Sequence, residues 1–389
     1  MSVQGLLSVL MVNYNTAALT QQSVASLRAQ SVFQPNGHPG ALTVIVVDNA
    51  SRSEERRRLA GIEATLIAND ENRGYGPALN QALAQTNSEF VLFSNSDTWY
   101  APGSLQIMID AFRRLPRCGA VGPRFYWDAD HTFLLPPSDP VSLSVYVDGT
   151  LQRVWPGWRE FRRRQWRQHA LRYWHTRQSL IQPMLSGACI LTHKDVLSAC
   201  GGFDEEFRLY YEDTDWCRRV QQKGYRLYYL PTAEVTHLYN QSARQEVSVT
   251  RAIGRASEAR YFQKHYGMRL WSLLSRTVGD GRAGEDETSR SDAWIDLGAC
   301  REPPVFSQIA SFQGECLWQL SPHPSCVPAI ARFVSSPEEL TLPPPVWHQL
   351  GDGTFFAQLF SLPDLKPMRR WRWRKVCSSE DAQRKSGGR

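Results

Sequence analysis

Two aspartates lie directly after apolar runs, where a carboxylate can bind a ligand. Asp48 closes the run at residues 44–47, and there it could accept hydrogen bonds from a ribose or a base N–H group. Asp97 follows the run at 90–93, where an unpaired carboxylate costs free energy unless it faces a polar crevice or a cation. Taken alone, each aspartate is explained equally well as a turn residue that ends a strand.

A diphosphate could be held between these carboxylates. A hard divalent ion bridging Asp97 and a diphosphate would neutralise charge on a leaving group, and Asn95 and Ser96 supply further oxygens. Residues 72–80 offer two glycines, a proline suited to a helix start and the guanidinium of Arg73, which together favour close approach of a diphosphate. An ordinary loop has the same composition, so this stretch is a weak indication by itself.

Three carboxylates fall within four positions at the expected start of a helix, in residues 210–216. They are Glu212, Asp213 and Asp215. Like charges resist joint ionisation, so the pKa of one of them is expected to be raised, as a general base requires. Asp213 or Thr214 could instead be the N-cap of the helix. His237 ends an alternating strand and could ligate a metal, although a lone histidine is more often structural.

The elements that must position these residues follow from the hydrophobic pattern. The first 125 residues alternate short β-branched runs with amphipathic stretches, which is typical of a parallel sheet covered by helices. Strands are predicted at 6–12, 42–47, 64–68 and 90–93, and helices at 17–28, 77–84 and 102–115. Each strand ends in a polar cluster, and the carboxyl ends of strands in open α/β sheets form the ligand crevice. These clusters are therefore expected to converge on one ligand.

The rest of the chain predicts the end of this domain and a smaller second one. Further elements are expected at 188–191 (strand), 201–204 (loop), 213–223 (helix), 227–230 and 234–237 (strands). The predicted boundaries are a first domain at 1–278 with a basic aromatic insertion at 150–180, a Gly-rich acidic linker at 279–292, a β-rich accessory domain at 293–376 and a disordered tail at 377–389. The accessory domain is inferred from short apolar runs separated by prolines.

Composition limits the classes of protein that this chain can form. Of its 389 residues, 42% are hydrophobic and 21% charged, which supports packed cores and argues against global disorder. There is no apolar run of about 18 residues and no signal-peptide pattern, so a cytoplasmic protein that does not span a membrane is expected. The eight cysteines form no Cys-x-x-Cys pair, which favours reduced thiols over a zinc site.

The ordered motifs resemble those of the family 2 glycosyltransferases, inverting enzymes of GT-A fold, and among them the bacterial rhamnosyltransferase-like and galactofuranosyltransferase-like members. The resemblance covers about residues 6–245 and leaves the C-terminal domain outside. The matching stretches are 9–15, 46–51, 72–76, 94–98, 186–188, 201–205 and 211–215. Seven motifs in the same order and at similar spacing are far more specific than any one of them.

The resemblance implies a nucleotide-sugar-binding domain, with a Rossmann-like mixed sheet and helices on both faces. Asp48 would contact the nucleoside, and Asp97 with His237 would hold Mg²⁺ or Mn²⁺ against the diphosphate. The expected donor-binding residues are Asn13, Asn15, Asp48, Asn49, Arg73, Gly74, Asn80 and Asn95. The family usually has a second carboxylate or an Asn-Pro-Asp motif where this chain has Asn95, so Arg73 is expected to share the compensation of diphosphate charge.

Asp213 matches the family's catalytic base. It would take a proton from an acceptor hydroxyl while that oxygen attacks the anomeric carbon and the nucleoside diphosphate leaves from the opposite face, so one displacement inverts the anomeric centre. An aromatic face suits the apolar side of a sugar, which adds Trp216 to the expected acceptor site. The acceptor-binding residues are expected to be Gly187, Ala188, Glu212, Asp215 and Trp216.

Two basic segments carry many aromatic side chains. Residues 153–177 contain eight arginines and six aromatic residues, and residues 369–375 repeat this composition. Such a mixture suits a headgroup layer, where each basic residue contributes about 1 kcal/mol, so peripheral attachment to the inner face of a membrane is expected. That location would fit a lipid-linked acceptor. The alternatives are a solvated helical hairpin over the acceptor site and a nucleic-acid patch, and no nucleic-acid partner is expected because the basicity is local.

The predicted function is therefore transfer of a hexose from a nucleotide-diphosphate sugar to a hydroxyl of a glycan or lipid-linked acceptor, in bacterial surface polysaccharide synthesis. One alternative is a glycosyltransferase that acts on a soluble small molecule or a protein. Another is a catalytically impaired sugar-nucleotide-binding scaffold, which Asn95 favours and Asp213 opposes. The sequence does not specify the donor sugar, its base, the acceptor or the linkage.

Overall fold

The computed structural model describes residues 5–139, 141–144, 148–149, 151–152, 155–238, 247–277, 294–307, 312 and 314–376, with only the backbone at 247–249 and 273–277. The chain forms two compact units. The first unit comprises residues 1–125, 138–145 and 176–276, and the second comprises 126–137, 146–175 and 277–389. These units divide the chain differently from the expected boundaries, because residues 146–175 belong with the C-terminal part. The expected linker at 279–292 and tail at 377–389 lie outside the described residues.

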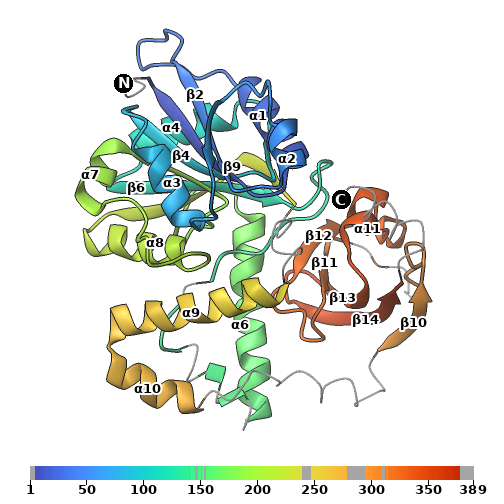
Figure 1. Ribbon diagram of the computed structural model, residues 1–389. Coiled ribbons are helices and arrows are strands. Elements are labelled where there is room, and N and C mark those ends of the chain that lie inside the picture. The colour runs from blue at the N-terminus through green and yellow to red at the C-terminus, as the bar shows by residue number, and fades with distance from the viewer. Residues whose placement is uncertain are drawn as a thin grey trace. The chain divides into compact units, whose positions relative to one another are not determined.

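The first unit is built on a mixed sheet (Figure 1). Among the described residues its nine strands are β1 (Leu7–Asn13), β2 (Leu42–Asn49), β3 (Thr65–Asn69), β4 (Phe90–Asn95), β5 (Thr98–Tyr100), β6 (Cys118–Tyr126), β7 (Leu180–Gln182), β8 (Cys189–His193) and β9 (Arg226–His237). They lie in the order β3-β2-β1-β4-β8-β6-β9-β5, and β7 pairs with β9. The pairs among β3, β2, β1 and β4 are parallel, whereas β8 runs antiparallel to β4 and β6. The predicted mixed α/β architecture is confirmed.

Five helices pack on the faces of this sheet: α1 (Ala17–Arg28), α3 (Tyr75–Leu83), α4 (Ser104–Arg114), α7 (Lys194–Cys200) and α8 (Glu212–Gln222). The described part of the unit also contains α2 (Ser53–Arg58), α9 (Val247–Tyr266) and α10 (Met268–Thr277). Leu10 and Val12 pack into one core with side chains of α3, α7 and α8. The alternate residues Val9 and Met11 are also fully buried, on the opposite face. Burial on both faces explains why these strands are unbroken apolar runs.

One long strand replaces two predicted ones. The sequence around Pro231 predicts strands at 227–230 and 234–237, but β9 runs through the proline as a single strand. Its first part pairs with β7 and its last part with β5, so Pro231 lies between the two stretches of pairing. A proline is tolerated there because its missing N–H falls where neither of these two neighbours needs a donor.

The second unit contains a sheet of five strands among the described residues, in the order β10-β14-β13-β11-β12 (Figure 1). The strands are β10 (Ile295–Cys300), β11 (Cys316–Ser321), β12 (Ile330–Val334), β13 (Gly353–Ser361) and β14 (Lys366–Lys375), with the short helices η4 (Pro337–Glu339) and α11 (Pro344–Gln349). The predicted β-rich character of this part is confirmed. In β14, Trp371 and Trp373 are buried in the core, so these two aromatic side chains are not available to a membrane.

Helix α6 (Pro156–His175), which carries most of the first basic aromatic segment, packs on this sheet. Its Arg167 is buried and donates to the carbonyl of Ser325 at 2.9 Å and to Gln358 Oε1 at 3.3 Å. The indole of Trp174 donates to the carbonyl of Leu135 at 2.8 Å. Burial lowers the pKa of Arg167. Residues 156–175 therefore form one continuous helix, and part of this basic aromatic segment is core instead of exposed surface.

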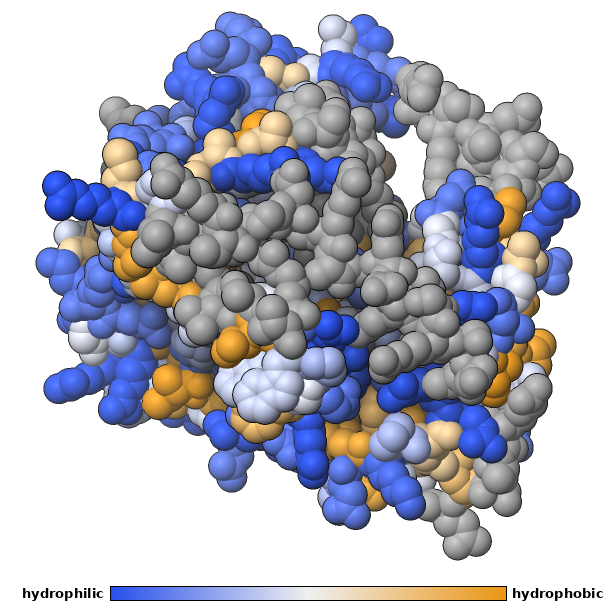
Figure 2. Space-filling model, turned by 90° about the horizontal axis from the view of Figure 1, so that it is seen from below, coloured by the Kyte–Doolittle hydropathy of each residue, from blue (hydrophilic) through white to orange (hydrophobic). Residues whose placement is uncertain are grey.

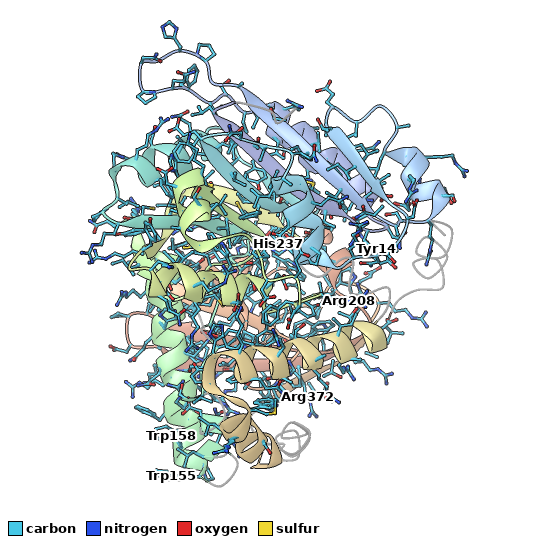
Figure 3. The ribbon with its side chains drawn as sticks, turned by 60° about the vertical axis from the view of Figure 1, so that its left-hand side comes forward. Tyr14, Trp155, Trp158, Arg208, His237 and Arg372 are labelled. Atoms are coloured by element: carbon cyan, nitrogen blue, oxygen red, sulfur yellow. The ribbon has the colours of Figure 1, made fainter. Side chains whose placement is uncertain are left out.

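Only one end of α6 keeps large aromatic side chains exposed. Trp155 is 58% exposed and Phe161 48%, and Trp158 stacks beside Trp155 with ring centroids 6.2 Å apart. Figure 3 places Trp155 and Trp158 together at the N-terminal end of the helix. On the face drawn in Figure 2, hydrophobic residues among the coloured atoms form separate patches within a mainly hydrophilic surface. Within the described part of the chain, no helix has the length and apolar character needed to cross a bilayer.

Candidate active site

The parallel strands β1 and β2 end side by side, with Asn13 opposite Asp48. The amide of Asn13 donates to Asp48 Oδ1 at 2.8 Å and to Ser51 Oγ at 2.9 Å. The second oxygen of Asp48 accepts from Arg56 Nε at 2.8 Å, and the aspartate is fully buried. Asp48 thus fixes the guanidinium of Arg56 beside the strand ends. Arg56 was not predicted as a site residue, because its helix α2 has no apolar periodicity and could not be recognised in the sequence.

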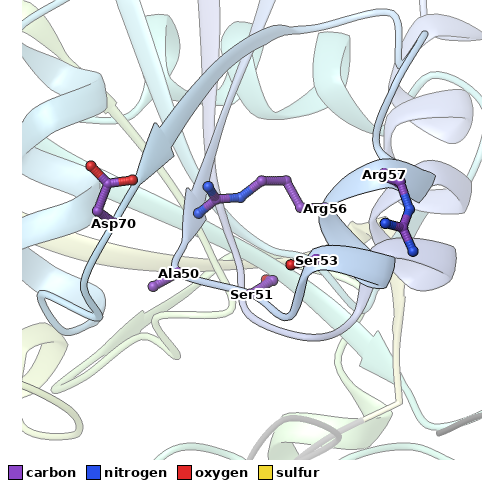
Figure 4. Close-up of a pocket in the computed structure, with 6 residues that line it drawn as sticks. All are labelled: Ala50, Ser51, Ser53, Arg56, Arg57 and Asp70. Carbon is purple, nitrogen blue, oxygen red and sulfur yellow. The ribbon is translucent and has the colours of Figure 1, made fainter.

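An open cavity of about 460 Å³ lies next to this pair (Figure 4). Its lining residues are Ala50, Ser51, Ser53, Arg56, Arg57 and Asp70. Two guanidinium groups, a carboxylate and two hydroxyls can satisfy the polar edges of a nucleoside. Asp48, the predicted nucleoside contact, is not among the lining residues, and its two oxygens are engaged by Asn13 and Arg56.

Asn49 shapes the loop that carries Arg73 and Gly74. Its amide donates to the Gly74 carbonyl at 3.1 Å, and its oxygen accepts from the Arg73 N–H at 3.1 Å. Gly74 has φ +97°, and a Cβ there would lie 2.5 Å from the Arg208 carbonyl oxygen, so only glycine fits. The side chain of Arg73 is exposed at the rim of the site. Asn49 therefore holds the loop through both ends of its side-chain amide, and the side chain of Arg73 is left exposed.

Two predicted donor-binding residues instead use their side chains to hold loops. Asn15 accepts from the Arg52 N–H at 2.9 Å. Asn80 donates to the Phe203 carbonyl at 2.8 Å and accepts from the Phe203 N–H at 2.9 Å, which ties α3 to the loop before α8. Both polar atoms of the Asn80 side chain are engaged, so a donor contact would have to displace these bonds.

Asp97 follows the end of β4 and lies next to His237 at the end of β9. His237 is labelled in Figure 3. Asp97 Oδ1 lies 3.4 Å from His237 Nε2, and both residues are buried. Asn95 Nδ2 lies 3.4 Å from the same imidazole nitrogen. Across the described part of the chain, no third His, Cys, Asp or Glu completes a metal cluster. One carboxylate and one imidazole fit a divalent ion that takes its remaining ligands from phosphates and water.

Asp213 lies in the first turn of α8 and is held by main-chain groups. Its Oδ2 accepts from the Gly187 N–H at 2.8 Å, and its Oδ1 accepts from the Thr214 N–H at 2.7 Å. Desolvation raises the pKa of Asp213 although these bonds oppose the shift. The pKa of Glu212 is raised well above its ordinary value by burial and by the charge of Asp213. Within the described residues, Glu212 Oε2 is buried without a hydrogen bond.

The backbone before α8 is strained. Tyr210 and Tyr211 have φ values of +65° and +67°, a left-handed conformation that is costly for bulky side chains. Helix α8 begins at Glu212 with Tyr211 as its N-cap, so the predicted N-cap at Asp213 or Thr214 is wrong. The two tyrosines turn the chain so that the carboxylates of the first turn lie next to Gly187.

Asp215 and Trp216 do not form an acceptor surface. Asp215 is fully buried and pairs with Arg219 Nε at 2.8 Å, Lys264 Nζ at 2.7 Å and His265 Nε2 at 2.8 Å, and these partners lower its pKa. Trp216 is fully buried in the core, and its indole donates to a backbone carbonyl. Both predictions fail for the same physical reason: packing has used the polar and aromatic surface that a sugar would need.

The loop 186–188 contacts both Asp213 and Asn95. The Gly187 N–H holds Asp213, and the carbonyl of buried Ala188 accepts from the Asn95 N–H at 2.9 Å. Gly187 and Ala188 therefore contribute backbone groups, whereas the sequence analysis assigned them to the acceptor.

Substitution of Gly187 by alanine is expected to displace the base. A Cβ at Gly187 would lie 2.9 Å from Asp213 Oδ2 and 3.0 Å from its Cβ, so the carboxylate must move. We expect catalytic turnover to fall by roughly 100-fold, since a misplaced catalytic group costs about that much. Gly351→Ala is the matched control, because a Cβ at Gly351 meets nothing within 4 Å. Turnover of Gly187→Ala within twofold of wild type would contradict this placement.

The mixed sheet, the polar carboxyl edge and the buried Asp97–His237 pair define a domain of GT-A fold. Residues 8–193 match the model of the family described as Glycosyl transferase family 2. The matched region is just under half of the chain, and within it the chain is similar to that family.

Two proteins of known name have sequences similar to this chain. The chain is 30% identical over 189 residues to N-acetylglucosaminyl-diphospho-decaprenol L-rhamnosyltransferase of Mycobacterium tuberculosis, an alignment of 44% of this chain and 58% of the relative. The chain thus spans somewhat more than half the length of that relative. It is also 24% identical over 265 residues to the O-antigen biosynthesis protein RfbC of Myxococcus xanthus, an alignment of 65% of this chain and 18% of the relative.

Among solved structures, the mannosyltransferase PcManGT from Pyrobaculum calidifontis, in complex with GDP-Man and Mn²⁺, aligns with a TM-score of 0.43 and 19% identity. The alignment covers 71% of this chain and 69% of that one.

Proposed function

We propose that this chain is an inverting glycosyltransferase that moves a sugar from a nucleotide-diphosphate sugar to a hydroxyl of a glycan or lipid-linked acceptor in the synthesis of bacterial cell-surface polysaccharide. One observation carries the proposal: the dipeptide Gly187–Ala188 holds the candidate base Asp213 through one backbone group and Asn95 of the diphosphate side through the next. This link holds the candidate base at a fixed distance from the diphosphate side of the site. A single displacement needs such a fixed distance between the base and the leaving group.

In the proposed reaction, Asp213 accepts the proton of the acceptor hydroxyl. The acceptor oxygen forms a bond to the anomeric carbon as the bond from that carbon to the diphosphate oxygen breaks, and the electron pair leaves with the nucleoside diphosphate. Attack from the opposite face inverts the anomeric centre. The raised pKa of Asp213 makes this carboxylate a stronger base than an ordinary aspartate.

The leaving diphosphate needs compensation of its charge. A Mg²⁺ or Mn²⁺ ion held by Asp97 and His237 would neutralise charge on the departing diphosphate. The exposed guanidinium of Arg73 adds a further cation at the rim. Arg56 and Arg57 belong to the neighbouring cavity, where we propose that the nucleoside binds.

A screen of nucleotide sugars tests this function. The purified chain is mixed with UDP-, GDP- and dTDP-sugars, with Mn²⁺ or with a chelator, and melting temperature and transfer to a polyprenyl-diphosphate glycan are measured. The relative named as an L-rhamnosyltransferase makes nucleotide-activated rhamnose the first donor to try. One donor should raise the melting temperature and be turned over. If no nucleotide sugar changes the melting temperature, with Mn²⁺ or with the chelator, the proposal fails at its first step.

We further propose that the exposed end of α6 contacts the inner face of the cytoplasmic membrane, where a lipid-linked acceptor would be found. Trp155 and Phe161 are exposed there, and Arg164 and Arg172 are exposed further along the helix. Exposed aromatic and basic side chains on one helix suit an anionic headgroup layer.

Flotation with vesicles of phosphatidylglycerol tests this contact. The double variant Arg164→Gln, Arg172→Gln is expected to bind roughly 30-fold more weakly, since each basic residue contributes about 1 kcal/mol at an anionic surface. Buried Arg167 is left unchanged because its loss would disturb the core. Arg114→Gln, an exposed arginine of α4, is the control. Equal flotation of the double variant and wild type would remove the membrane contact from the proposal.

A further inference from the structure

Tyr75 lies between the base and the diphosphate side of the site. Its hydroxyl is 2.7 Å from Asn95 Oδ1 and 3.3 Å from the carbonyl oxygen of Gly187. From Gly187, the next bond leads to Asp213 at 2.8 Å. From Asn95, the amide nitrogen lies 3.4 Å from His237 Nε2. The Tyr75 hydroxyl therefore contacts both Gly187, which holds Asp213, and Asn95, which lies next to His237.

The chemistry of the hydroxyl makes this contact specific. A phenol has a single hydrogen, so Tyr75 can donate to only one of its two acceptors at a time. Burial and the charges of Glu212, Asp213 and Asp97 raise the pKa of Tyr75 well above 10, which keeps that hydrogen in place. Asn95 Oδ1 and the Gly187 carbonyl oxygen compete for this one hydrogen. If either acceptor moves away, the hydroxyl donates to the other one.

We propose that Tyr75 is a positioning residue: its hydroxyl holds the Gly187–Asp213 pair at a fixed position relative to the Asn95–His237 pair. This inference rests on the proposed function, since it assigns a role within the transfer reaction. When the hydroxyl donates to the Gly187 carbonyl, it restrains the backbone of Gly187 on one side of the Cα atom. The N–H on the other side of that Cα atom is then kept in place for its bond to Asp213 Oδ2. When the hydroxyl donates to Asn95, it fixes the side-chain oxygen and leaves the NH₂ group facing His237.

The variant Tyr75→Phe removes the hydroxyl and keeps the ring. We expect kcat to fall roughly tenfold while the KM for the donor stays within about twofold, because the bridge orients groups and does not bind the nucleoside. Without the bond to its carbonyl, Gly187 should shift and lengthen the bond from its N–H to Asp213 Oδ2. Loss of that bond raises the pKa of Asp213, so the acidic limb of the pH profile of kcat moves to higher pH. The other titratable groups near Asp213 are Glu212, which is coupled to it, and Cys217, whose pKa of about 12 keeps the thiol neutral.

Amide hydrogen exchange of the free protein gives a readout that needs no substrate. In Tyr75→Phe, the amides of Asn95 and Gly187 should both exchange about tenfold faster, while the rest of the sheet keeps its rates. Tyr228→Phe is the matched control: this buried tyrosine of β9 donates to the Pro116 carbonyl at 2.9 Å, near the other end of the strand from His237. It should leave exchange at both amides, kcat and the pH profile unchanged.

The outcomes separate this inference from the proposed function. If wild type transfers no sugar, the proposed function fails, and the exchange of the two amides still decides whether Tyr75 joins them. Unchanged exchange at both amides in Tyr75→Phe overturns the inference. So does a uniform rise at all amides of the first unit, which would mean a general loss of stability.

Discussion

Asp213→Asn should abolish most sugar transfer while leaving the donor bound. Asparagine keeps the size of the side chain and its oxygen can still accept from the Gly187 N–H, but it cannot take a proton from the acceptor. General bases contribute about 10² to 10⁴ in rate, and we expect a loss of roughly 10³-fold in kcat. The shift in melting temperature produced by the donor should stay near that of wild type.

The control for this variant is Asp195→Asn in α7, an aspartate with a 76% exposed side chain. It should retain full activity. If Asp213→Asn keeps more than about a tenth of the wild-type rate, the base lies elsewhere. Glu212 would then be the first residue to test, because its buried carboxyl adjoins Asp213 and its pKa is also raised.

Asp215→Asn is expected to have the largest effect on stability. The substitution removes the charge that faces Arg219, Lys264 and His265 in a fully buried position. Breaking a buried pair from one side leaves cations without compensation, so the free energy of unfolding should fall by about 3 kcal/mol. Urea denaturation of both proteins measures the change. Asp296→Asn, which breaks the exposed pair with Arg372, should cost about 1 kcal/mol or less.

The pH dependence of this loss has a definite sign. The pKa of Asp215 is lowered in the folded protein below its ordinary 3.8, so its contribution is complete above that value and disappears as the pH falls below it. The difference in stability between wild type and Asp215→Asn should therefore shrink below about pH 4. A difference that stays constant down to pH 2 would exclude the ion cluster as its source. Asp213 and Glu212 have raised pKa values and act in the opposite direction, which favours the folded state as they become protonated.

Much of the first unit could be predicted because its strands are buried on both faces. Such strands are unbroken apolar runs, and β1, β2 and β4 were found within a few residues of their bounds. Helix α2 was missed since none of its residues is buried and its sequence has no apolar stripe. The division into units could not be predicted, because Arg167 meets Gln319 across 152 residues of chain.

For the site, the motifs indicated which residues converge but not which of their atoms are available. Asn13 and Asp48 lie side by side, as expected for residues at the carboxyl ends of neighbouring parallel strands. Asp215 was assigned to the acceptor because its partners Lys264 and His265 lie about 50 residues away, outside any motif. Tyr75 was part of a quoted motif, yet its bridge depends on loop geometry that no spacing rule describes.

The packing of α6 also has a consequence for synthesis on the ribosome. Arg167 contacts Gln319 and Gln358, and Trp166 packs against the core cluster that contains Phe356, so these side chains of α6 depend on strands that follow more than a hundred residues later in the chain. At common rates of translation, α6 emerges on the order of ten seconds before the sheet that covers it. During that interval these side chains lack their native partners, whereas the first unit is completed by residue 276. Nascent chains should therefore need chaperone protection chiefly at α6, and a chain that ends near residue 280 would leave this helix permanently uncovered.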